Sequence, residues 1–94
     1  MIRFVVQIDL TEANIPAFEA YERIVLDLMP EHGGRLEQRL RGVDRRVETH
    51  ILSFPSQSAF DAYLNDPRRT VHAEAWRTCG ATSDRWEVAE IGQS

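Results

Sequence analysis

Apolar residues recur at every second position near the start of the chain. Between residues 2 and 10, five apolar side chains share one parity, and mostly polar residues separate them. Because successive side chains of a strand point to opposite faces, this alternation predicts a β-strand with one buried face. The buried side chains would be Ile2, Phe4, Val6, Ile8 and Leu10.

The apolar spacing changes to three and four residues between residues 18 and 32, which predicts an amphipathic helix of about five turns. Asn14 is the expected N-cap. Pro30 should loosen the last turn, because proline removes a backbone hydrogen bond. Gly33 and Gly34 should end the helix, one of them in the left-handed conformation. The inner stripe would be Phe18, Tyr21, Val25, Leu28 and His32.

Two further alternating segments, residues 35–41 and 47–54, follow the glycines and predict a β-hairpin. A one-residue slip would move every side chain to the other face, so grouping the apolar residues selects one register. That register pairs Leu40 with Val47 and Leu36 with Ile51, and it sets Glu37 opposite His50 and Arg39 opposite Glu48.

The rest of the chain predicts helices followed by one strand. Ser56 should begin a short helix, and Asp66 should begin a third helix that ends at Gly80. Residues 84–91 alternate around Trp86, which we assign to the core. The order strand, helix, strand, strand, helices, strand favours an antiparallel sheet in the spatial order 4-1-3-2 with the helices on one face. This is a ferredoxin-like α+β fold (βαββαβ), which we expect to span residues 1–94 as a single domain.

The second face of this sheet has no helix to cover it and is expected to be mixed in character. Its apolar residues are too many for a face in water, and its charges are too many for a core. A second copy of the chain would cover such a face, which predicts a two-fold homodimer with a central cavity between the two sheets. The expected residues of this face are Val5, Gln7, Asp9, Glu37, Arg39, His50, Leu52, Phe54, Glu87, Ala89 and Ile91.

Charge and composition narrow the classes of partner. Eleven basic residues, all of them Arg, oppose 15 acidic ones, for a net charge of −4. This argues against nucleic-acid or anionic-membrane partners, which require a concentrated basic surface. The single cysteine, Cys79, suits a reducing compartment, and the chain starts with neither a signal peptide nor an apolar segment long enough to cross a bilayer. We therefore expect a soluble, cytoplasmic protein.

The runs LMPEHGGRLEQR and VETHILSFPSQSAFDAYLNDP resemble the small stand-alone dimeric α/β-barrel proteins, especially a group of similar length whose function is unknown. The most specific matches are HGG at residues 32–34 and FPS at residues 54–56. The resemblance implies the predicted fold and dimer, and its wider relatives include cofactor-free monooxygenases of antibiotic biosynthesis, isomerases and haem-degrading enzymes. Members of the nearest group often carry an aromatic residue or His early in the third helix and an Arg near its end, positions that His72 and Arg77 approximate.

The strongest catalytic candidate is His50, with Glu37 as its expected partner. A carboxylate that bonds to an imidazole raises its basicity and fixes its tautomer, as a general base requires. Arg39 and Gln7 would hold an anionic or carbonyl-bearing ligand nearby. The alternative is a cross-strand polar pair that is only structural.

The remaining candidates are weaker. His72, Trp76 and Arg77 would line the cavity mouth, or Trp76 would belong to the core with the other two at its wetted edge. His32 is expected to cap the C-terminus of its helix, and Cys79 lies where a helix dipole disfavours the thiolate. We expect no bound metal or cofactor, because the histidines share no ligand spacing and no glycine-rich phosphate loop occurs.

Two classes of function remain open from the sequence. The first is a cofactor-independent enzyme, monooxygenase-like or isomerase-like, that acts on a small carbonyl or phenolic compound with His50 as its base. The second is a non-catalytic structural or metabolite-binding homodimer.

Overall fold

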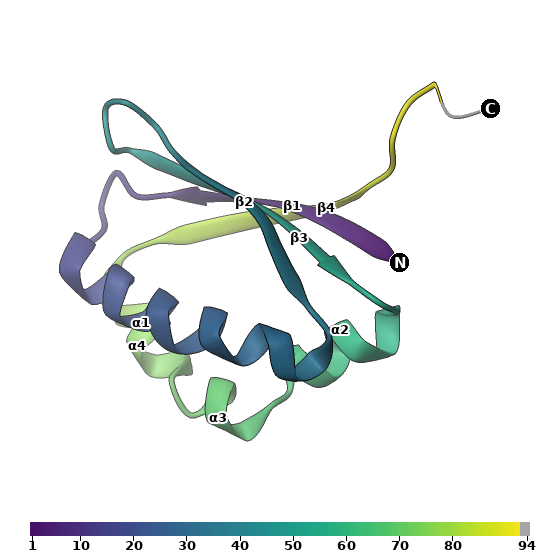
Figure 1. The fold of residues 1–94 in the computed structure, drawn as a ribbon. Helices are drawn as coiled ribbons and strands as arrows, with labels where there is room; N and C mark the ends of the chain where they lie inside the picture. Colours follow the sequence, from purple (N-terminus) through teal and green to yellow (C-terminus); the bar gives the residue numbers. More distant parts are fainter. Residues whose placement is uncertain (93–94) are drawn as a thin grey trace.

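The computed structural model describes residues 1–92 and places a four-stranded sheet against a layer of helices. Figure 1 shows all the helices on one side of the sheet, so the other face is uncovered. The elements in chain order are β1 (Ile2–Asp9), α1 (Ile15–Leu28), the 3₁₀ helix η1 (Met29–His32), β2 (Arg35–Arg41), β3 (Val47–Phe54), α2 (Gln57–Leu64), α3 (Pro67–Thr70), α4 (Ala73–Cys79) and β4 (Thr82–Val88).

The sheet has the order β2-β3-β1-β4 with antiparallel pairing throughout. This confirms the predicted order 4-1-3-2 and the ferredoxin-like arrangement. The strands β3 and β1 lie in the centre, and β2 and β4 are the two edges.

The boundaries of the first helix confirm the local predictions. The side chain of Asn14 accepts a hydrogen bond from the backbone N–H of Ala17 at 3.0 Å, and the turn that contains Pro30 tightens into η1. Gly33 ends η1 with φ 73°, and a Cβ at this position would lie 2.7 Å from Cγ of Pro55. Both the conformation and the close contact therefore require glycine.

The predicted third helix is two helices. Asp66 begins α3 and accepts a hydrogen bond from the Arg68 N–H at 2.9 Å. The backbone N–H of His72 then bonds to the Arg69 carbonyl at 3.1 Å, three residues back instead of four. This tighter turn separates α3 from α4, which ends at Gly80 with φ 88°.

The predicted hairpin register is wrong. The structure pairs Leu36 with Leu52, and a bulge at Glu37 then shifts the pairing so that Arg39 faces His50. A bulge adds one residue to one strand, and a pattern that assumes uniform alternation cannot include it. Glu37 therefore does not pair with His50.

The predicted face of β3 is also wrong. Because Val6 pairs with His50 and Phe4 with Leu52, the even-numbered residues of β3 lie under the helices. His50, Leu52 and Phe54 are 3%, 6% and 0% exposed, so they belong to the interior. Glu37 instead accepts a hydrogen bond from the Ser53 hydroxyl at 2.6 Å, on the uncovered face.

The uncovered face still combines apolar and charged groups, although its members differ from those predicted. Trp86 pairs with Val5 on this face and is 51% exposed, so its assignment to the core is wrong. Leu40, on the edge strand β2, is 52% exposed, and Ile51 is half-buried. The face thus presents apolar side chains that nothing in one copy of the chain covers.

Candidate functional site

A cavity of about 380 Å³ lies between the sheet and the helices. Its apolar wall includes Val25, Leu52 and Phe60, and its polar groups include Glu22, His50 and Arg69. The volume lies within the range typical of small-molecule sites, which combine apolar walls with a few convergent polar groups. This cavity lies inside one copy of the chain and is distinct from the one expected between the two sheets of a dimer.

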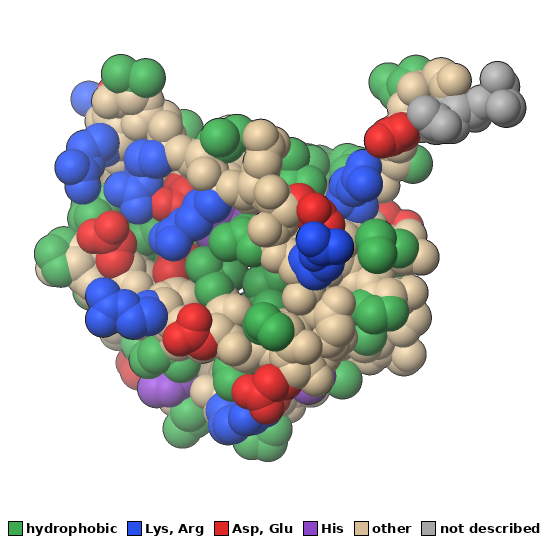
Figure 2. Space-filling view, in the orientation of Figure 1, with side chains coloured by type: hydrophobic (Ala, Val, Ile, Leu, Met, Phe, Trp, Pro, Cys, Tyr) green, Lys and Arg blue, Asp and Glu red, His purple; other side chains and the backbone are tan. Residues whose placement is uncertain are grey.

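The surface view locates a second depression at the edge of this interior. Figure 2 shows a hollow between α1 and the sheet, with hydrophobic side chains inside it and charged side chains around it. A groove is lined by residues of α1 and β2, among them Arg39 and Leu26, and Leu26 also lines the interior cavity. One side chain therefore borders both spaces.

His50 is held by a buried carboxylate at one end of the cavity. Its Nε2 lies 2.5 Å from Oε2 of Glu48, a side chain that is 1% exposed. Arg39 donates from Nε to Oε2 of Glu48 at 2.9 Å, and Arg41 donates to Oε1 at 2.8 Å. Both oxygens of Glu48 thus have charged donors, which satisfies an anion in the interior.

These contacts fix the charge states of the pair. Burial alone would raise the pKa of Glu48, but hydrogen bonds from His50, Arg41 and Arg39 outweigh burial and lower it. Burial, together with the positive charges of Arg39 and Arg41, lowers the pKa of His50 more than the Glu48 carboxylate raises it. At neutral pH the pair therefore consists of a carboxylate and a neutral imidazole.

The neutral imidazole is consequently restricted to one tautomer. A carboxylate only accepts hydrogen bonds, so Nε2 of His50 must carry the proton that bonds to Glu48. Nδ1 then keeps its lone pair and lies 4.0 Å from Oε2 of Glu22. His50 and Glu22 both line the cavity, so the unprotonated nitrogen lies beside a second cavity residue.

Glu22 supplies a second titratable group beside His50. It is 5% exposed on the inner side of α1. Burial, and secondarily the nearby Glu48 carboxylate, raises the pKa of Glu22 to about 7. Such a group exchanges a proton near neutral pH, which is the property of a general acid or base.

Glu22, Glu48 and His50 are also a candidate donor set for a metal ion, because their ligand atoms lie within 4.8 Å of one another. The surrounding charges do not suit a cation. Arg39 and Arg41 occupy the oxygens of Glu48, and a metal would have to displace these guanidinium donors. The set therefore fits proton transfer better than metal binding.

The structure separates most of the residues predicted to bind a ligand. Gln7 is exposed on the uncovered face, and Arg39 holds Glu48 instead of lining the cavity. Arg77 is exposed and pairs with Glu74. His72 is half-buried at the start of α4 and does not line the cavity, whereas Trp76 does.

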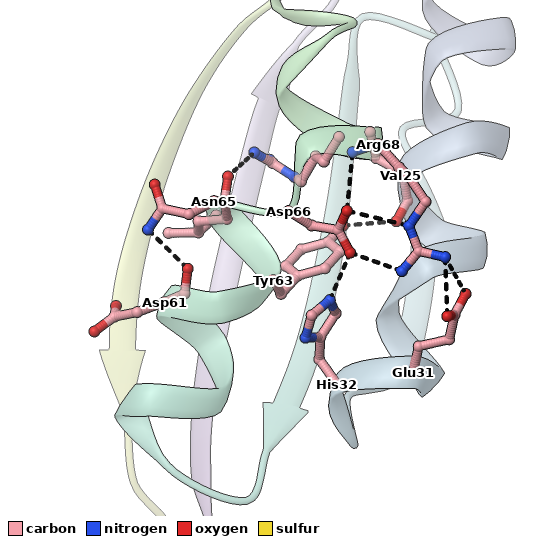
Figure 3. Close-up of polar contacts among 10 residues, drawn as sticks. Val25, Glu31, His32, Asp61, Tyr63, Asn65, Asp66 and Arg68 are labelled. Carbon is pink, nitrogen blue, oxygen red and sulfur yellow. Dashed lines mark hydrogen bonds and ion pairs between the residues drawn. The ribbon is translucent and has the colours of Figure 1, made fainter.

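His32 joins two helices instead of bonding the last carbonyls of its own. Its Nε2 lies 2.9 Å from Oδ2 of Asp66. The same carboxylate accepts from Nη2 of Arg68 at 2.8 Å, and Arg68 also bonds to Glu31, as Figure 3 shows. These contacts connect η1 to the start of α3.

Sequence reasoning missed Glu22 and Arg69, and although it placed Arg39 with Glu48, a contact that the structure contains, it missed the bond of Glu48 to His50. Glu22 lies four residues after Phe18, on the apolar stripe of α1, and a carboxylate at such a position is a detectable signal. Glu48 shares its parity with His50 and Leu52, so it follows once the inner face of β3 is known. No signal in the sequence separates Arg69 from Arg68, because both lie in one charged run.

No helix within residues 1–92 has the length and apolar character needed to cross a membrane. No protein-family model matches the sequence, and no curated protein matches it as a sequence relative. Solved structures do match its fold.

One similar structure is SnoaB, a cofactor-independent oxygenase from Streptomyces nogalater, with a TM-score of 0.78 and 21% identity over 98% of this chain and 94% of SnoaB. A candidate antibiotic biosynthesis monooxygenase from Deinococcus radiodurans has a TM-score of 0.63 and 12% identity over 100% of this chain and 98% of its own. A dimeric ferredoxin-like protein of unknown function from Jannaschia sp. CCS1 has a TM-score of 0.60 and 20% identity over 92% and 99% of the two chains. The chain thus has the ferredoxin-like fold of antibiotic-biosynthesis monooxygenase-type domains and of dimeric proteins whose function is unknown.

Proposed function

We propose that the protein is a cofactor-independent enzyme that removes a proton from a small phenolic or carbonyl compound in the cavity between its sheet and its helices. The observation that carries the proposal is the orientation of His50. Its Nε2 bonds to Glu48, and its Nδ1 lies 4.0 Å from Oε2 of Glu22, which together with His50 lines a cavity of about 380 Å³. A base that is neutral, held in one orientation and part of a cavity wall meets the requirements for general base catalysis.

The chemical step is a proton transfer. Nδ1 of His50 accepts the proton of a phenol or enol, which leaves a phenolate or enolate and an imidazolium. Glu48 stabilises that imidazolium through the existing hydrogen bond to Nε2. Arg39 and Arg41 keep Glu48 ionised, so the carboxylate orients the base without taking the proton itself.

The fold comparisons support an oxygenase in preference to an isomerase. SnoaB is named a cofactor-independent oxygenase and matches 98% of this chain in fold. A phenolate or enolate is the electron-rich form of such a substrate, and molecular oxygen reacts with it more readily than with the neutral form. Oxygen consumption that depends on His50 distinguishes oxygenation from isomerisation, which consumes no oxygen.

The proposal includes a homodimer formed by the uncovered sheet faces. Trp86 and Leu40 are each about half exposed there, at 51% and 52%, and the similar protein from Jannaschia is described as dimeric. Burying such side chains between two copies removes apolar area from water. In the alternative function, a non-catalytic dimer that binds a metabolite, the same cavity would hold a ligand without deprotonating it.

Absorbance titration with 2-naphthol tests the proton transfer, because 2-naphthol and its naphtholate have different spectra. Wild-type protein should increase the naphtholate fraction at neutral pH, and the His50→Gln variant should bind 2-naphthol without increasing it. His72→Gln is the matched control, because His72 does not line the cavity. Binding with no naphtholate in the wild type would favour the non-catalytic alternative.

A further inference from the structure

Arg69 lines the cavity and, unlike Arg39, Arg41 and Arg68, forms no ion pair with a carboxylate among residues 1–92, although its charge acts against the rise in the pKa of Glu22. Its guanidinium lies over the ring of Tyr63, 5.0 Å from the ring centroid, and Nη1 donates to the Leu64 carbonyl at 3.5 Å. Its Nε is buried and has no hydrogen-bond partner. Within residues 1–92 no carboxylate lies within ion-pair distance of Arg69.

This arrangement is costly unless something else completes it. A buried donor without an acceptor costs about 1–3 kcal/mol, and more when the group is charged. The adjacent Arg68 shows the ordinary solution, because it bonds to both Asp66 and Glu31. Arg39 and Arg41 likewise share Glu48. Arg69 keeps unused donors at a position that lines the cavity.

The neighbouring tyrosine cannot serve as the missing anion. Burial raises the pKa of Tyr63 to about 12, so its hydroxyl is neutral. That hydroxyl donates to the Val25 carbonyl at 2.8 Å, as Figure 3 shows. Tyr63 therefore offers Arg69 the face of a ring and a neutral hydroxyl oxygen for a hydrogen bond, but no counter-charge.

A second arginine lines the same cavity beside an adjoining ring. The guanidinium of Arg85, on β4, lies 4.8 Å from the ring centroid of Phe60 and 5.7 Å from that of Phe4. The rings of Phe60 and Tyr63 are 6.5 Å apart, so both guanidinium groups lie against one aromatic cluster. Arg85 also has no carboxylate partner among residues 1–92.

We propose that Arg69 is the anion-binding residue of the cavity and that the ligand is a planar aromatic carboxylate. The carboxylate accepts hydrogen bonds from the unused donors of Arg69, and Arg85 adds positive charge from the sheet side. Guanidinium and carboxylate groups are both planar, so they form paired hydrogen bonds. The aromatic wall of Phe60, Tyr63 and Trp76 favours a flat ring system as the rest of the ligand.

This ligand class deepens the proposed function and rests on it for one point only, the direction in which the ligand lies. With its carboxylate at Arg69, an aromatic acid that carries a phenolic hydroxyl would present that hydroxyl toward His50. Arg69 and His50 come from different elements, α3 and β3, and each lines the same cavity. Binding of the carboxylate and transfer of the proton are therefore separable properties.

Calorimetric titration with 2-naphthoate and its neutral analogue 2-naphthamide tests the anion site. Wild-type protein should bind the carboxylate more tightly than the amide. Arg69→Gln should weaken 2-naphthoate binding about tenfold or more and leave 2-naphthamide binding nearly unchanged. Arg77→Gln is the matched control, since Arg77 is exposed and pairs with Glu74 outside the cavity. Arg69→Lys keeps the positive charge but loses the paired donors of the guanidinium, so its affinity for 2-naphthoate should lie between those of the wild type and Arg69→Gln.

A phenolic acid separates the two proposals in one experiment. With 6-hydroxy-2-naphthoate, Arg69→Gln should raise the concentration needed for half-saturation but keep the wild-type naphtholate fraction at saturation. His50→Gln should keep the affinity and lose the naphtholate. Equal affinity of the wild type for naphthoate and naphthamide, or equal weakening of both by Arg69→Gln, would overturn the anion site, even where naphtholate still forms.

Discussion

Replacing Glu48 with Gln removes the charge that orients His50 while nearly preserving the shape of the side chain. Glu48 is 1% exposed and accepts from Arg39, Arg41 and His50. Removing one partner of a fully buried ion pair costs about 3–5 kcal/mol. The Arg39 and Arg41 side chains are 39% and 24% exposed, so both can regain water. We therefore expect Glu48→Gln to lower the free energy of unfolding by the lower end of this range, about 3 kcal/mol, as measured by urea unfolding at pH 7.

The loss should depend on pH in a defined direction. Because the pKa of Glu48 is lowered in the folded protein from its usual 4.5, its contribution to stability is complete above that value and disappears as pH falls through the folded pKa. Wild type and Glu48→Gln should therefore converge in stability as the pH falls below 4.5. Glu19→Gln is the control, because Glu19 is 49% exposed and 3.8 Å from Arg41, and it should change stability by less than about 1 kcal/mol.

The same variant should also abolish naphtholate formation, since an amide no longer requires the proton of His50 to lie on Nε2. A Glu48→Gln protein that is within about 1 kcal/mol of wild type and still forms naphtholate would refute the reasoning that Glu48 holds the base.

Three other substitutions test different parts of the structure. Burial raises the pKa of Glu22 from 4.5 to about 7, so the ionised side chain destabilises the folded protein above pH 7. Glu22→Gln should therefore stabilise the protein above pH 7 by up to about 3 kcal/mol and have little effect on stability at pH 4. Equal effects at the two pH values in urea unfolding would contradict this. Gly33→Ala forces an alanine into a left-handed conformation beside Pro55 and should lower stability by about 1–2 kcal/mol or more. Gly92→Ala is the comparison, because Gly92 also has a positive φ but has open space around it, so the difference between the two variants reports the close contact. An unchanged unfolding midpoint for Gly33→Ala would be inconsistent with the structure. Leu40→Glu places a charge on the uncovered face and should shift sedimentation from dimer to monomer; a monomeric wild type at high concentration would contradict the proposed interface.

Features determined by neighbouring residues could be predicted from the sequence. The Asn14 cap, the loosened turn at Pro30 and the glycine-terminated helices follow from chemistry within a few residues. The order of the strands followed from the order of elements and the rules of connection. These features do not depend on which face of each strand is buried.

The face of β3 could not be predicted in this way, because both parities of the strand carry apolar residues. Val47 and Ile51 compete with Leu52 and Phe54, and the second pair is the bulkier. The pairing with β1 decides the outcome, and the bulge at Glu37 changes the partners in β2. Burial of Glu48 is tolerable only because two arginines on β2 reach it, and this condition exists only in the folded chain.

The candidate site was therefore predicted in part. His50 was identified from the sequence, but its partner is Glu48 instead of Glu37, and its cavity lies under the helices. Arg68 and Arg69 are adjacent in one charged run, yet Arg68 forms surface ion pairs and Arg69 lines the cavity. Both residues lie in α3, where consecutive side chains point about 100° apart, and the short run of α3 has no apolar pattern that indicates which of them faces the interior.

The protonation of His50 can be measured directly by nitrogen NMR of protein labelled with ¹⁵N-histidine. We predict that at pH 7 the His50 signals are those of a neutral ring with the proton on Nε2 and a lone pair on Nδ1, and that this state persists to a pH below the usual pKa of 6.5. A ring that is protonated on both nitrogens at pH 7, or that carries its single proton on Nδ1, would contradict the assignment of His50 as the base of the cavity.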